Sequence, residues 1–472
     1  MNKTKIVATL GPNSSNKEIM REMFNAGLGA CRINFSHGSY DEHTAAINTI
    51  RELNQELNAN VAILADLQGP KIRTGLMEND SINLERGSTC QIITKPVTGN
   101  SECFSINYLD LPKDVKPGER ILLDDGKLVL QVEKTDYQSC IHCTVIQGGV
   151  LSSKKGVNFP NTKISMPSLT EKDKADLTFA LEHRVDWVCL SFVRSAQDII
   201  KLKELIASQG GKAKVIAKIE KPEALNCIEE IISATDGVMV ARGDLGVETP
   251  YQRVPVIQKM LIDQCVAKAK PVIVATQMME SMIHSMTPSR AEVNDVANAV
   301  LDGADAVMLS GETSVGKYPV EVIQTISNIV EEIEKSPEVF HREVMPDPVH
   351  ERFITDSICF NACRLAHRVQ AKAIITMSFS GYTAFKVSSQ RPDSAIYVFT
   401  SNRMILSQLN LLWGVKAFFY DKHVSTDHTI ADIKHFLSSN EYVKTGDLII
   451  NIASMPIEDY GGSNMLKLSR VN

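Results

Sequence analysis

The sequence has few of the features that mark membrane proteins or nucleic-acid-binding proteins. Its 472 residues contain no run that approaches the roughly 20 apolar residues that a membrane span needs. Only 6% of the residues are aromatic, and no group of them forms a stacking platform for bases. The net charge of -6 excludes a strongly basic surface. We therefore expect neither a membrane nor a nucleic acid as a partner.

Cysteine is present, but its distribution does not point to disulfides. The ten cysteines are scattered through a chain whose size needs no covalent staples, and Cys31 and Cys189 lie inside apolar runs, as reduced thiols do. Cys140, His142 and Cys143 lie in a strand-like stretch without a second ligand pair, so we do not expect a zinc site there. Because the chain starts without an apolar signal region, we expect a cytoplasmic protein.

Eight apolar, strand-like runs alternate with helix-period segments in the first two thirds of the chain. Most runs are followed by an amphipathic helix, such as Lys17–Asn25 or the segment 320–333. This arrangement favours a closed (β/α)8 TIM barrel over an open sheet. The expected strands are 6–10, 31–35, 61–67, 187–192, 215–219, 238–241, 272–275 and 306–309.

The alternation of strand and helix stops between the third and fourth expected strands. Residues 70–165 alternate apolar and polar positions, and Asp125-Gly126 marks a hairpin. We interpret them as an inserted β-barrel lid domain between barrel segments 1–69 and 166–343. Tethered at a strand end, the insert should lie over the barrel mouth and exclude water. Residues 344–472, with expected strands at 373–377, 396–400 and 448–453, predict a C-terminal α/β open-sheet domain.

Two of the apolar runs end abruptly in charge. The run 215–219 contains Lys218 near its end and is followed by Glu220, and the run 238–241 is followed by Arg242 and Asp244. Burying this much charge is costly unless something pairs with it. Two carboxylates at adjacent strand ends suit a hard divalent cation, and a lysine and an arginine nearby suit phosphate. The alternative is two internal ion pairs, Lys218 with Asp244 and Glu220 with Arg242.

Other polar side chains fall at the same ends of the expected strands. The carboxyl ends of barrel strands meet in one mouth, where barrel active sites are built, so these residues should gather in one site. We expect Ser310 to be structural, and a buried pairing with Asp66 is the alternative role for Arg32. The polar residues at the strand ends are Arg32, Asn34, Ser36, Asp66, Thr276 and Ser310.

Seven short motifs, in this order, resemble those of the pyruvate kinase family. Each is weak alone, but together they span nearly the whole chain and agree with the β insert and the α/β tail. The resemblance implies transfer of the phosphoryl group of phosphoenolpyruvate to ADP, the last step of glycolysis, under a lid and with a regulatory C-terminal domain. The motifs are Asn34-Phe-Ser-His-Gly38, Gly69-Pro-Lys-Ile-Arg73, Lys155-Gly-Val-Asn158, Lys218-Ile-Glu220, Ala241-Arg-Gly-Asp-Leu-Gly246, Ala275-Thr-Gln-Met278 and Leu309-Ser-Gly-Glu312.

The resemblance also implies roles for the charged strand ends. Glu220 and Asp244 would hold magnesium or manganese. Lys218 would neutralise the moving phosphoryl group, and Arg32 would clamp the phosphate of the substrate. Thr276 would contact the substrate and order the relay that protonates the enolate. Backbone N–H groups would bind the substrate carboxylate at a helix start. The implied substrate-binding residues are Arg32, Lys218, Gly243, Asp244 and Thr276.

A nucleotide site is implied at the second strand end and the lid. Its residues would be Asn34, Ser36, His37, Arg73 and Lys155, and for His37 the alternative is a loop histidine that only orients its neighbours. Many family members bind potassium at positions that match Asn34, Ser36, Asp66 and Leu67, and carry glutamate where this chain has Lys71. Because a lysine there supplies a fixed positive charge, we expect that potassium is not required.

In the C-terminal region, small hydroxyl residues and a glycine lie between an expected strand and an expected helix. Ser378, Ser380, Gly381 and Thr383 can form an anion nest, and the resemblance implies a phosphorylated allosteric effector there. A helix cap without a ligand is the alternative.

The resemblance also implies a homotetramer. Two other functions stay open: another phosphoenolpyruvate- or pyruvate-using barrel enzyme, and a metabolite-binding regulator without activity.

Overall fold

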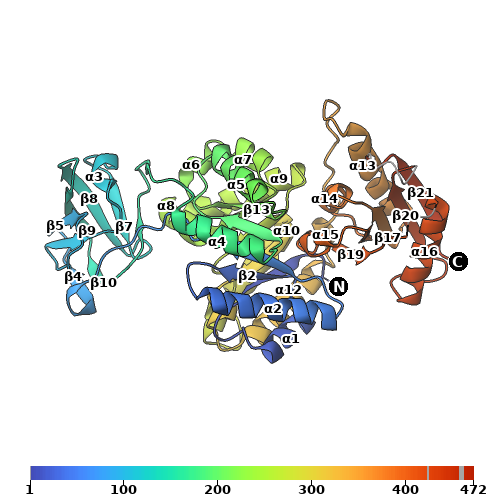
Figure 1. Ribbon diagram of the computed structural model, residues 1–472, viewed down its shortest axis with the longest axis horizontal. Helices are drawn as coiled ribbons and strands as arrows, with labels where there is room; N and C mark the ends of the chain where they lie inside the picture. Colours follow the sequence, from blue (N-terminus) through green and yellow to red (C-terminus); the bar gives the residue numbers. More distant parts are fainter. Residues whose placement is uncertain (1, 423–424, 456–461) are drawn as a thin grey trace.

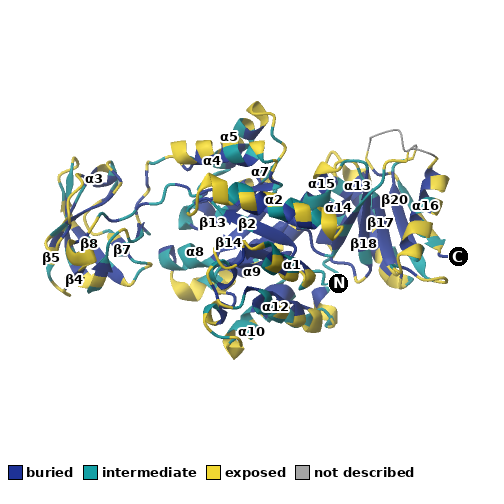
Figure 2. Cartoon of the chain, turned by 60° about the horizontal axis from the view of Figure 1, so that its bottom comes forward, coloured by how far each residue is buried: buried dark blue, intermediate teal, exposed yellow. Residues whose placement is uncertain are grey.

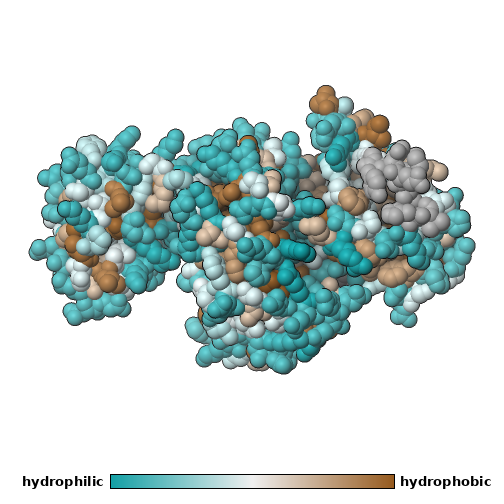
Figure 3. Space-filling view, viewed as in Figure 1, coloured by the Kyte–Doolittle hydropathy of each residue, from teal (hydrophilic) through white to brown (hydrophobic). Residues whose placement is uncertain are grey.

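The computed structural model describes residues 2–422, 425–455 and 462–472, which form three units in a row (Figure 1). An eight-stranded barrel lies in the middle, a β domain at one end and an α/β domain at the other. The face shown in Figure 3 is mostly hydrophilic, with scattered apolar side chains. No helix within these ranges is long and apolar enough to cross a membrane.

The barrel is closed by parallel strands in the order β1-β16-β15-β14-β13-β12-β3-β2. All eight expected strands are present, which confirms the predicted TIM barrel. Most strand residues are buried on both faces of the barrel wall, so the strands form nearly continuous apolar runs in the sequence. The strands are β1 (Lys5–Thr9), β2 (Ala30–Asn34), β3 (Ala62–Asp66), β12 (Trp187–Leu190), β13 (Lys214–Ile219), β14 (Gly237–Ala241), β15 (Val272–Ala275) and β16 (Ala306–Leu309).

Helices with one buried face surround the barrel strands (Figure 2). Several begin at capping boxes, in which the side chains of Ser39 and Glu42, or of Ser289 and Glu292, satisfy free N–H groups at the helix start. The helices are α1 (Lys17–Asn25), α2 (Tyr40–Glu56), α4 (Glu171–Glu182), α5 (Ala196–Ser208), α6 (Pro222–Leu225), α7 (Ile228–Ala234), α8 (Arg242–Glu248), α9 (Val254–Ala267), α10 (Arg290–Asp302), α11 (Gly311–Ser314) and α12 (Pro319–Ile333), with 3-10 turns at Tyr251–Arg253 and Glu280–Ile283.

The β domain is inserted between β3 and β12 and has its own apolar core. The predicted hairpin is confirmed: β7 and β8 pair antiparallel across a turn in which Asp124, Asp125 and Gly126 have positive φ, a conformation that aspartate and glycine tolerate. The strands form a six-stranded sheet in the order β11-β7-β8-β9-β5-β6 and a two-stranded sheet, β10-β4. The elements are a 3-10 turn (Glu78–Asp80), β4 (Ser81–Leu84), β5 (Thr89–Ile93), β6 (Cys103–Ser105), α3 (Leu111–Asp114), β7 (Arg120–Leu123), β8 (Leu128–Thr135), β9 (Cys140–Gln147), β10 (Gly149–Ser152) and β11 (Val157–Asn158).

The C-terminal domain is an open sheet in the order β19-β18-β17-β20-β21, with only β21 antiparallel to its neighbour. The three expected strands are present. Two further strands, β19 and β21, were not predicted; β21 is a partly exposed edge strand that contains Lys467 and Arg470, so its apolar signal is weak. The elements are α13 (Phe353–Arg368), β17 (Ala373–Met377), α14 (Tyr382–Ser389), β18 (Ala395–Thr400), α15 (Met404–Leu409), β19 (Val415–Phe419), α16 (Thr426–Ser439), β20 (Leu448–Ala453) and β21 (Met465–Arg470). A 3-10 turn (Pro337–Val339) precedes this domain and packs on the barrel.

The C-terminal domain covers the amino-terminal end of the barrel. Leu411 joins the apolar cluster inside the barrel, and Trp187 Nε1 donates to the Gln408 carbonyl at 3.3 Å. Across the same junction, the buried Arg391 guanidinium pairs with Asp305 at 2.8 Å. The opposite end of the barrel, where the strands end, is therefore the end that faces the inserted β domain.

Candidate active site

The barrel mouth holds a buried cluster of charge. Asp66 ends β3, and its carboxylate accepts from Arg32 Nε at 2.6 Å and lies 3.2 Å from Lys218 Nζ. Lys218 Nζ also lies 3.0 Å from Glu220 Oε1 and donates to Ser191 Oγ at 2.8 Å. The side chains come from four neighbouring segments of the barrel, β2, β3, β12 and β13. The alternative pairing of Arg32 with Asp66 is thus present within a larger network.

Opposite charges in this network counteract the effect of burial on Lys218 and Asp66. Asp66 and Glu220 are at most 2% exposed, and Arg32 and Lys218 are each 12% exposed. Burial alone would lower the pKa of the Lys218 ammonium, but Asp66 and Glu220 raise it above its ordinary value. Burial alone would raise the pKa of the Asp66 carboxyl, but Lys218 and Arg32 hold it below its ordinary value. The mouth is therefore a preorganised charged surface.

The two internal ion pairs considered as an alternative are wrong. Lys218 binds Glu220 instead of Asp244, because residues two apart in an extended chain lie on the same side. Arg242 NH1 binds Asp295 at 2.7 Å, so it does not neutralise Glu220. In the part of the chain that the structure describes, no hydrogen bond or ion pair engages the Asp244 carboxylate. A half-buried carboxylate without a partner is thus left at the mouth.

Thr276 follows β15 with a strained backbone. The φ angles of Thr276 and Gln277 are 69° and 54°, in the left-handed region that is costly for a β-branched residue. Arg242 fixes this conformation, since its NH2 donates to the Thr276 carbonyl at 2.7 Å. The Thr276 hydroxyl accepts the Gly243 N–H at 2.8 Å. That N–H, expected to be open for a substrate carboxylate, is therefore already bonded.

A pocket between the lid and the barrel is lined by groups from both domains. Lys71 lies after β3, Asp125 lies in the β7–β8 turn, and Asp244 lies in the first turn of α8; all three border it. No hydrogen bond or ion pair engages the Lys71 ammonium among the described residues. Convergent charged groups without protein partners are expected where a charged ligand binds.

Comparison with known proteins connects this geometry to a family. The family model of the pyruvate kinase barrel domain matches residues 1–323, and that of the pyruvate kinase alpha/beta domain matches residues 356–469. The chain belongs to the pyruvate kinase family. Pyruvate kinases are phosphotransferases that act on phosphoenolpyruvate and ADP and need a divalent metal ion.

Individual pyruvate kinases match over the whole chain. The chain is 44% identical over 474 residues to pyruvate kinase 2 of Synechocystis sp., covering 99% of this chain and 79% of that protein. It is 41% identical to the pyruvate kinase of Clostridium acetobutylicum, with 100% of both chains covered. The crystal structure of a pyruvate kinase from Cryptosporidium parvum matches with a TM-score of 0.94 at 34% identity, covering 100% of this chain and 96% of that chain.

The loop after β2, where pyruvate kinase resemblance implied nucleotide contacts, is held by its own side chains. Asn34 Oδ1 accepts the Ser36 N–H at 3.1 Å. His37 is exposed, and partial burial of its ring together with the charges of Arg73 and Lys71 lowers its pKa. This shift favours the neutral imidazole, which can act as a hydrogen-bonding group beside two cations.

The other two expected nucleotide residues lie where the lid joins the barrel. Arg73 NH1 donates to the Lys154 carbonyl at 3.0 Å, and Lys155 Nζ pairs with Asp124 at 2.9 Å. Residue 73 lies on the chain that enters the lid and residue 155 on the chain that leaves it, and a β-bridge joins Arg73 to Gly156. Both side chains therefore lie at the junction of the β domain with the barrel, which we call the lid hinge.

Three of the groups expected at a monovalent-cation site already have protein partners. Asn34 Oδ1 accepts an N–H, and the Asp66 carboxylate is shared by Arg32 and Lys218. The Leu67 carbonyl accepts the Ser191 hydroxyl at 2.7 Å.

A second pocket lies in the C-terminal domain at the start of α14. Ser378, Ser380 and Thr383 line it, as expected for the effector loop. Gly381, with φ of 82°, caps α14, and its N–H donates to Ser378 Oγ at 3.0 Å. The hydroxyls of Thr383 and Ser463 are 3.2 Å apart.

Two cations that the sequence reasoning did not name, Arg352 and Lys422, also line this pocket. Tyr460, two residues before the pocket residue Gly462 in the sequence, lies outside the described residues.

Sequence reasoning missed two residues of the barrel mouth. Ser191 binds both Lys218 and the Leu67 carbonyl, and the Phe192 N–H donates to Glu220 Oε2 at 2.7 Å. Both residues were missed because the expected strand, 187–192, included them, whereas β12 ends at Leu190. A polar residue directly after an apolar run was the available signal, as it was for the other strands.

Proposed function

We propose that this chain transfers the phosphoryl group of phosphoenolpyruvate to ADP at the barrel mouth, forming pyruvate and ATP. The observation that carries the proposal is the buried network of Arg32, Asp66, Lys218 and Glu220 beside the unpaired Asp244, in a member of the pyruvate kinase family. Phosphoryl transfer needs charge neutralisation and alignment more than it needs a nucleophilic side chain. The network provides fixed charges of both signs.

Two cations would act on the phosphoryl group. Lys218 Nζ has three partners that fix it, so little reorganisation is needed when charge develops as the phosphoryl group leaves the enolate oxygen. Arg32 is held through Nε by Asp66 and through NH1 by Thr9 at 2.9 Å. Its NH2 group has no partner among the described side chains and carbonyls, so it is available to a substrate phosphate.

Glu220 and Asp244 fit a hard divalent cation, which we propose is magnesium or manganese. Both supply carboxylate oxygens, the ligands that such cations prefer. Burial raises the pKa of the Glu220 carboxyl against the opposing charge of Lys218, and the negative charge of Asp244 adds to the rise. A cation beside both groups would stabilise their ionised forms. When bound, the metal supplies charge neutralisation at substrate oxygens.

Thr276 would help to protonate the enolate product. Its hydroxyl donates to the Ala275 carbonyl at 2.6 Å and accepts the Gly243 N–H, which gives it a fixed orientation at the mouth. A threonine is not an acid by itself, so its role would be to order the water or hydroxyl relay that delivers the proton. Gly243 and Thr276 would contact the substrate together, with Arg242 holding their loop.

ADP would bind between the loop after β2 and the lid hinge. Asn34, Ser36 and His37 would contact it from the barrel, and Arg73 and Lys155 would reach its phosphates from the hinge. Lys155 would then exchange Asp124 for phosphate. Closure of the lid, residues 70–165 in our predicted division of the chain, would exclude water from the mouth.

Lys71 would replace a monovalent cation. It borders the pocket that lies between the lid and the barrel and has no ion-pair partner in the described ranges. The groups that would otherwise hold potassium are engaged by the protein, as described above for Asn34, Asp66 and Leu67. Two cations in one pocket would also repel each other.

The C-terminal pocket would bind the phosphate of an allosteric effector. Ser378, Ser380, Gly381 and Thr383 offer hydroxyl and N–H donors, and the pocket is also lined by basic side chains.

We further propose a cytoplasmic homotetramer on the strength of the family. Sedimentation velocity that shows a monomer at working concentration would reject the tetramer.

A turnover assay tests the proposed function. Pyruvate should form from phosphoenolpyruvate only when ADP and magnesium are both present, with stoichiometric ATP. Pyruvate release that is independent of ADP would favour a different phosphoenolpyruvate-using barrel enzyme. Absence of turnover with folded protein would favour a metabolite-binding regulator.

A further inference from the structure

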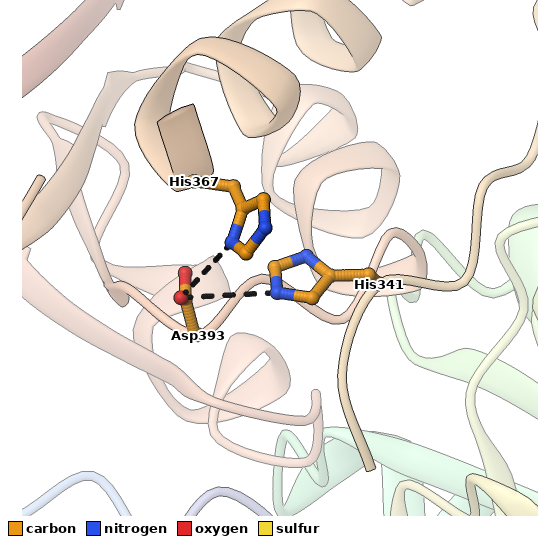
Figure 4. Close-up of side chains that lie close together, drawn as sticks. All are labelled: His341, His367 and Asp393. Atoms are coloured by element: carbon orange, nitrogen blue, oxygen red, sulfur yellow. Dashed lines mark hydrogen bonds and ion pairs between the residues drawn. The ribbon is translucent and has the colours of Figure 1, made fainter. Parts of the chain in front are cut away.

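Three separate segments bring two histidines and an aspartate together beside the C-terminal domain (Figure 4). His341 lies between α12 and α13, His367 in the last turn of α13, and Asp393 between α14 and β18. The two imidazole rings have centroids 4.0 Å apart, and both rings approach the Asp393 carboxylate. This group lies near the amino-terminal end of the barrel, which the C-terminal domain covers, and therefore away from the mouth.

We propose that His341, His367 and Asp393 bind one divalent transition-metal ion of the zinc type. Each residue offers one ligand atom, and these atoms lie within 4.8 Å of one another. His367 Nδ1 and His341 Nε2 lie 3.4 Å and 3.7 Å from the same oxygen, Asp393 Oδ2. Ligand atoms around a tetrahedral zinc ion, with bonds of about 2.0–2.1 Å, are roughly 3.3 Å apart. Only small side-chain movements therefore separate this arrangement from a coordination sphere.

The ligand set selects the class of metal. Two imidazoles and one carboxylate, with a further position open to water, are the ligands that zinc accepts. Magnesium prefers a shell of oxygens in octahedral geometry, so it would not compete for this site. The side chains of His341, Asp393 and His367 are 33%, 41% and 58% exposed, so an ion and its water ligand can reach them from solvent.

Backbone hydrogen bonds hold in place the linker, the segment between α12 and α13 that carries His341. The His341 N–H donates to the Arg391 carbonyl at 2.8 Å, and the Arg342 N–H donates to the Gln390 carbonyl at 3.1 Å. The linker is thus paired with the loop that carries Asp393. His341 also has φ of 63°, an uncommon conformation for a residue other than glycine that persists only where the surroundings fix it.

The local charges are compatible with a bound cation. The nearby Lys3 ammonium donates to the carbonyls of residues 392–394, and Glu334 offsets its charge. A metal ion here would join the linker from the barrel to two segments of the C-terminal domain.

The test is zinc titration of the full-length protein after treatment with a chelator and dialysis, in buffer that contains excess magnesium. We expect one equivalent of zinc to bind. His341→Ala, His367→Ala and Asp393→Asn should each weaken zinc binding by roughly tenfold or more. The matched control is His350→Ala, which removes a partly exposed histidine that pairs with Asp356 at 3.2 Å without a second imidazole. It should bind zinc like the parent.

Thermal unfolding provides a second measurement that does not depend on titration. An ion that binds only the folded protein raises the unfolding temperature of that protein. Zinc should therefore raise the unfolding temperature of the parent and of His350→Ala, but not that of the three site variants. Circular dichroism without zinc establishes that each variant is folded. Zinc uptake that survives all three substitutions, or that magnesium abolishes, would overturn the proposal, as would a parent protein that takes up no zinc.

Discussion

Replacing Lys218 by methionine tests the proposed chemistry directly, because it removes the charge and keeps an unbranched side chain. The Lys218 side chain is 12% exposed, so solvent screens its charge little. A unit charge about 4 Å from a negative group contributes about 4 kcal/mol at an effective dielectric constant of about 20. That energy corresponds to about three powers of ten in rate. We therefore expect kcat to fall by about two to four powers of ten.

Binding of phosphoenolpyruvate should survive the substitution. Asp66 would still hold Arg32 at 2.6 Å, so the proposed phosphate clamp is intact. The loss of Lys218 leaves Glu220 buried without its cation, which costs stability and favours its protonated form. The variant should therefore be folded but less stable than the parent.

The assay is steady-state pyruvate formation with saturating ADP and magnesium, and calorimetric binding of phosphoenolpyruvate accompanies it. Lys270→Met is the control, since Lys270 is a part-buried lysine that donates to the Thr235 carbonyl at 2.6 Å at the other end of the barrel. It should keep the kcat of the parent. A kcat for Lys218→Met within about tenfold of the parent would refute the assigned role of Lys218.

Glu220→Gln and Asp244→Asn should each raise the magnesium concentration that gives half-maximal turnover, because each removes one of two carboxylate charges; an unchanged magnesium dependence would mean that the metal binds elsewhere. The unmodified protein should be nearly fully active in buffer without sodium and potassium, and Lys71→Glu should acquire a potassium requirement. Strong activation of the unmodified protein by potassium would contradict this expectation. Replacing Ser380 and Thr383 together by alanine should reduce activation by phosphorylated effectors, measured as the change in turnover when effector is added. Loss of turnover without effector would instead indicate a structural loop.

The sequence alone determined the architecture of the barrel and the residues at its mouth. Strands buried on both faces form continuous apolar runs, which is why all eight barrel strands could be predicted. A charge directly after such a run lies at the carboxyl end of a strand, so Lys218, Glu220 and Asp66 could be assigned to one end of the barrel. The partly exposed edge strand β21 has no such run, and it was missed.

Only the tertiary structure decided which partner each charge meets. Arg242 could have turned toward Glu220, but it binds Asp295 and the Thr276 carbonyl. Ser191 can bind both the Leu67 carbonyl and Lys218 because β12 lies between β3 and β13 in the barrel. Periodicity in a sequence reports which face of an element is buried, whereas the ionic partner of a side chain is set by how elements pack.

His341, His367 and Asp393 show this difference most clearly. They lie in a linker, a helix end and a loop, and no spacing rule connects the three segments. Their side chains meet because the linker pairs with the loop after α14 while α13 packs against α14. Contacts of this kind depend on the relative placement of whole elements, which the local order of residues does not encode.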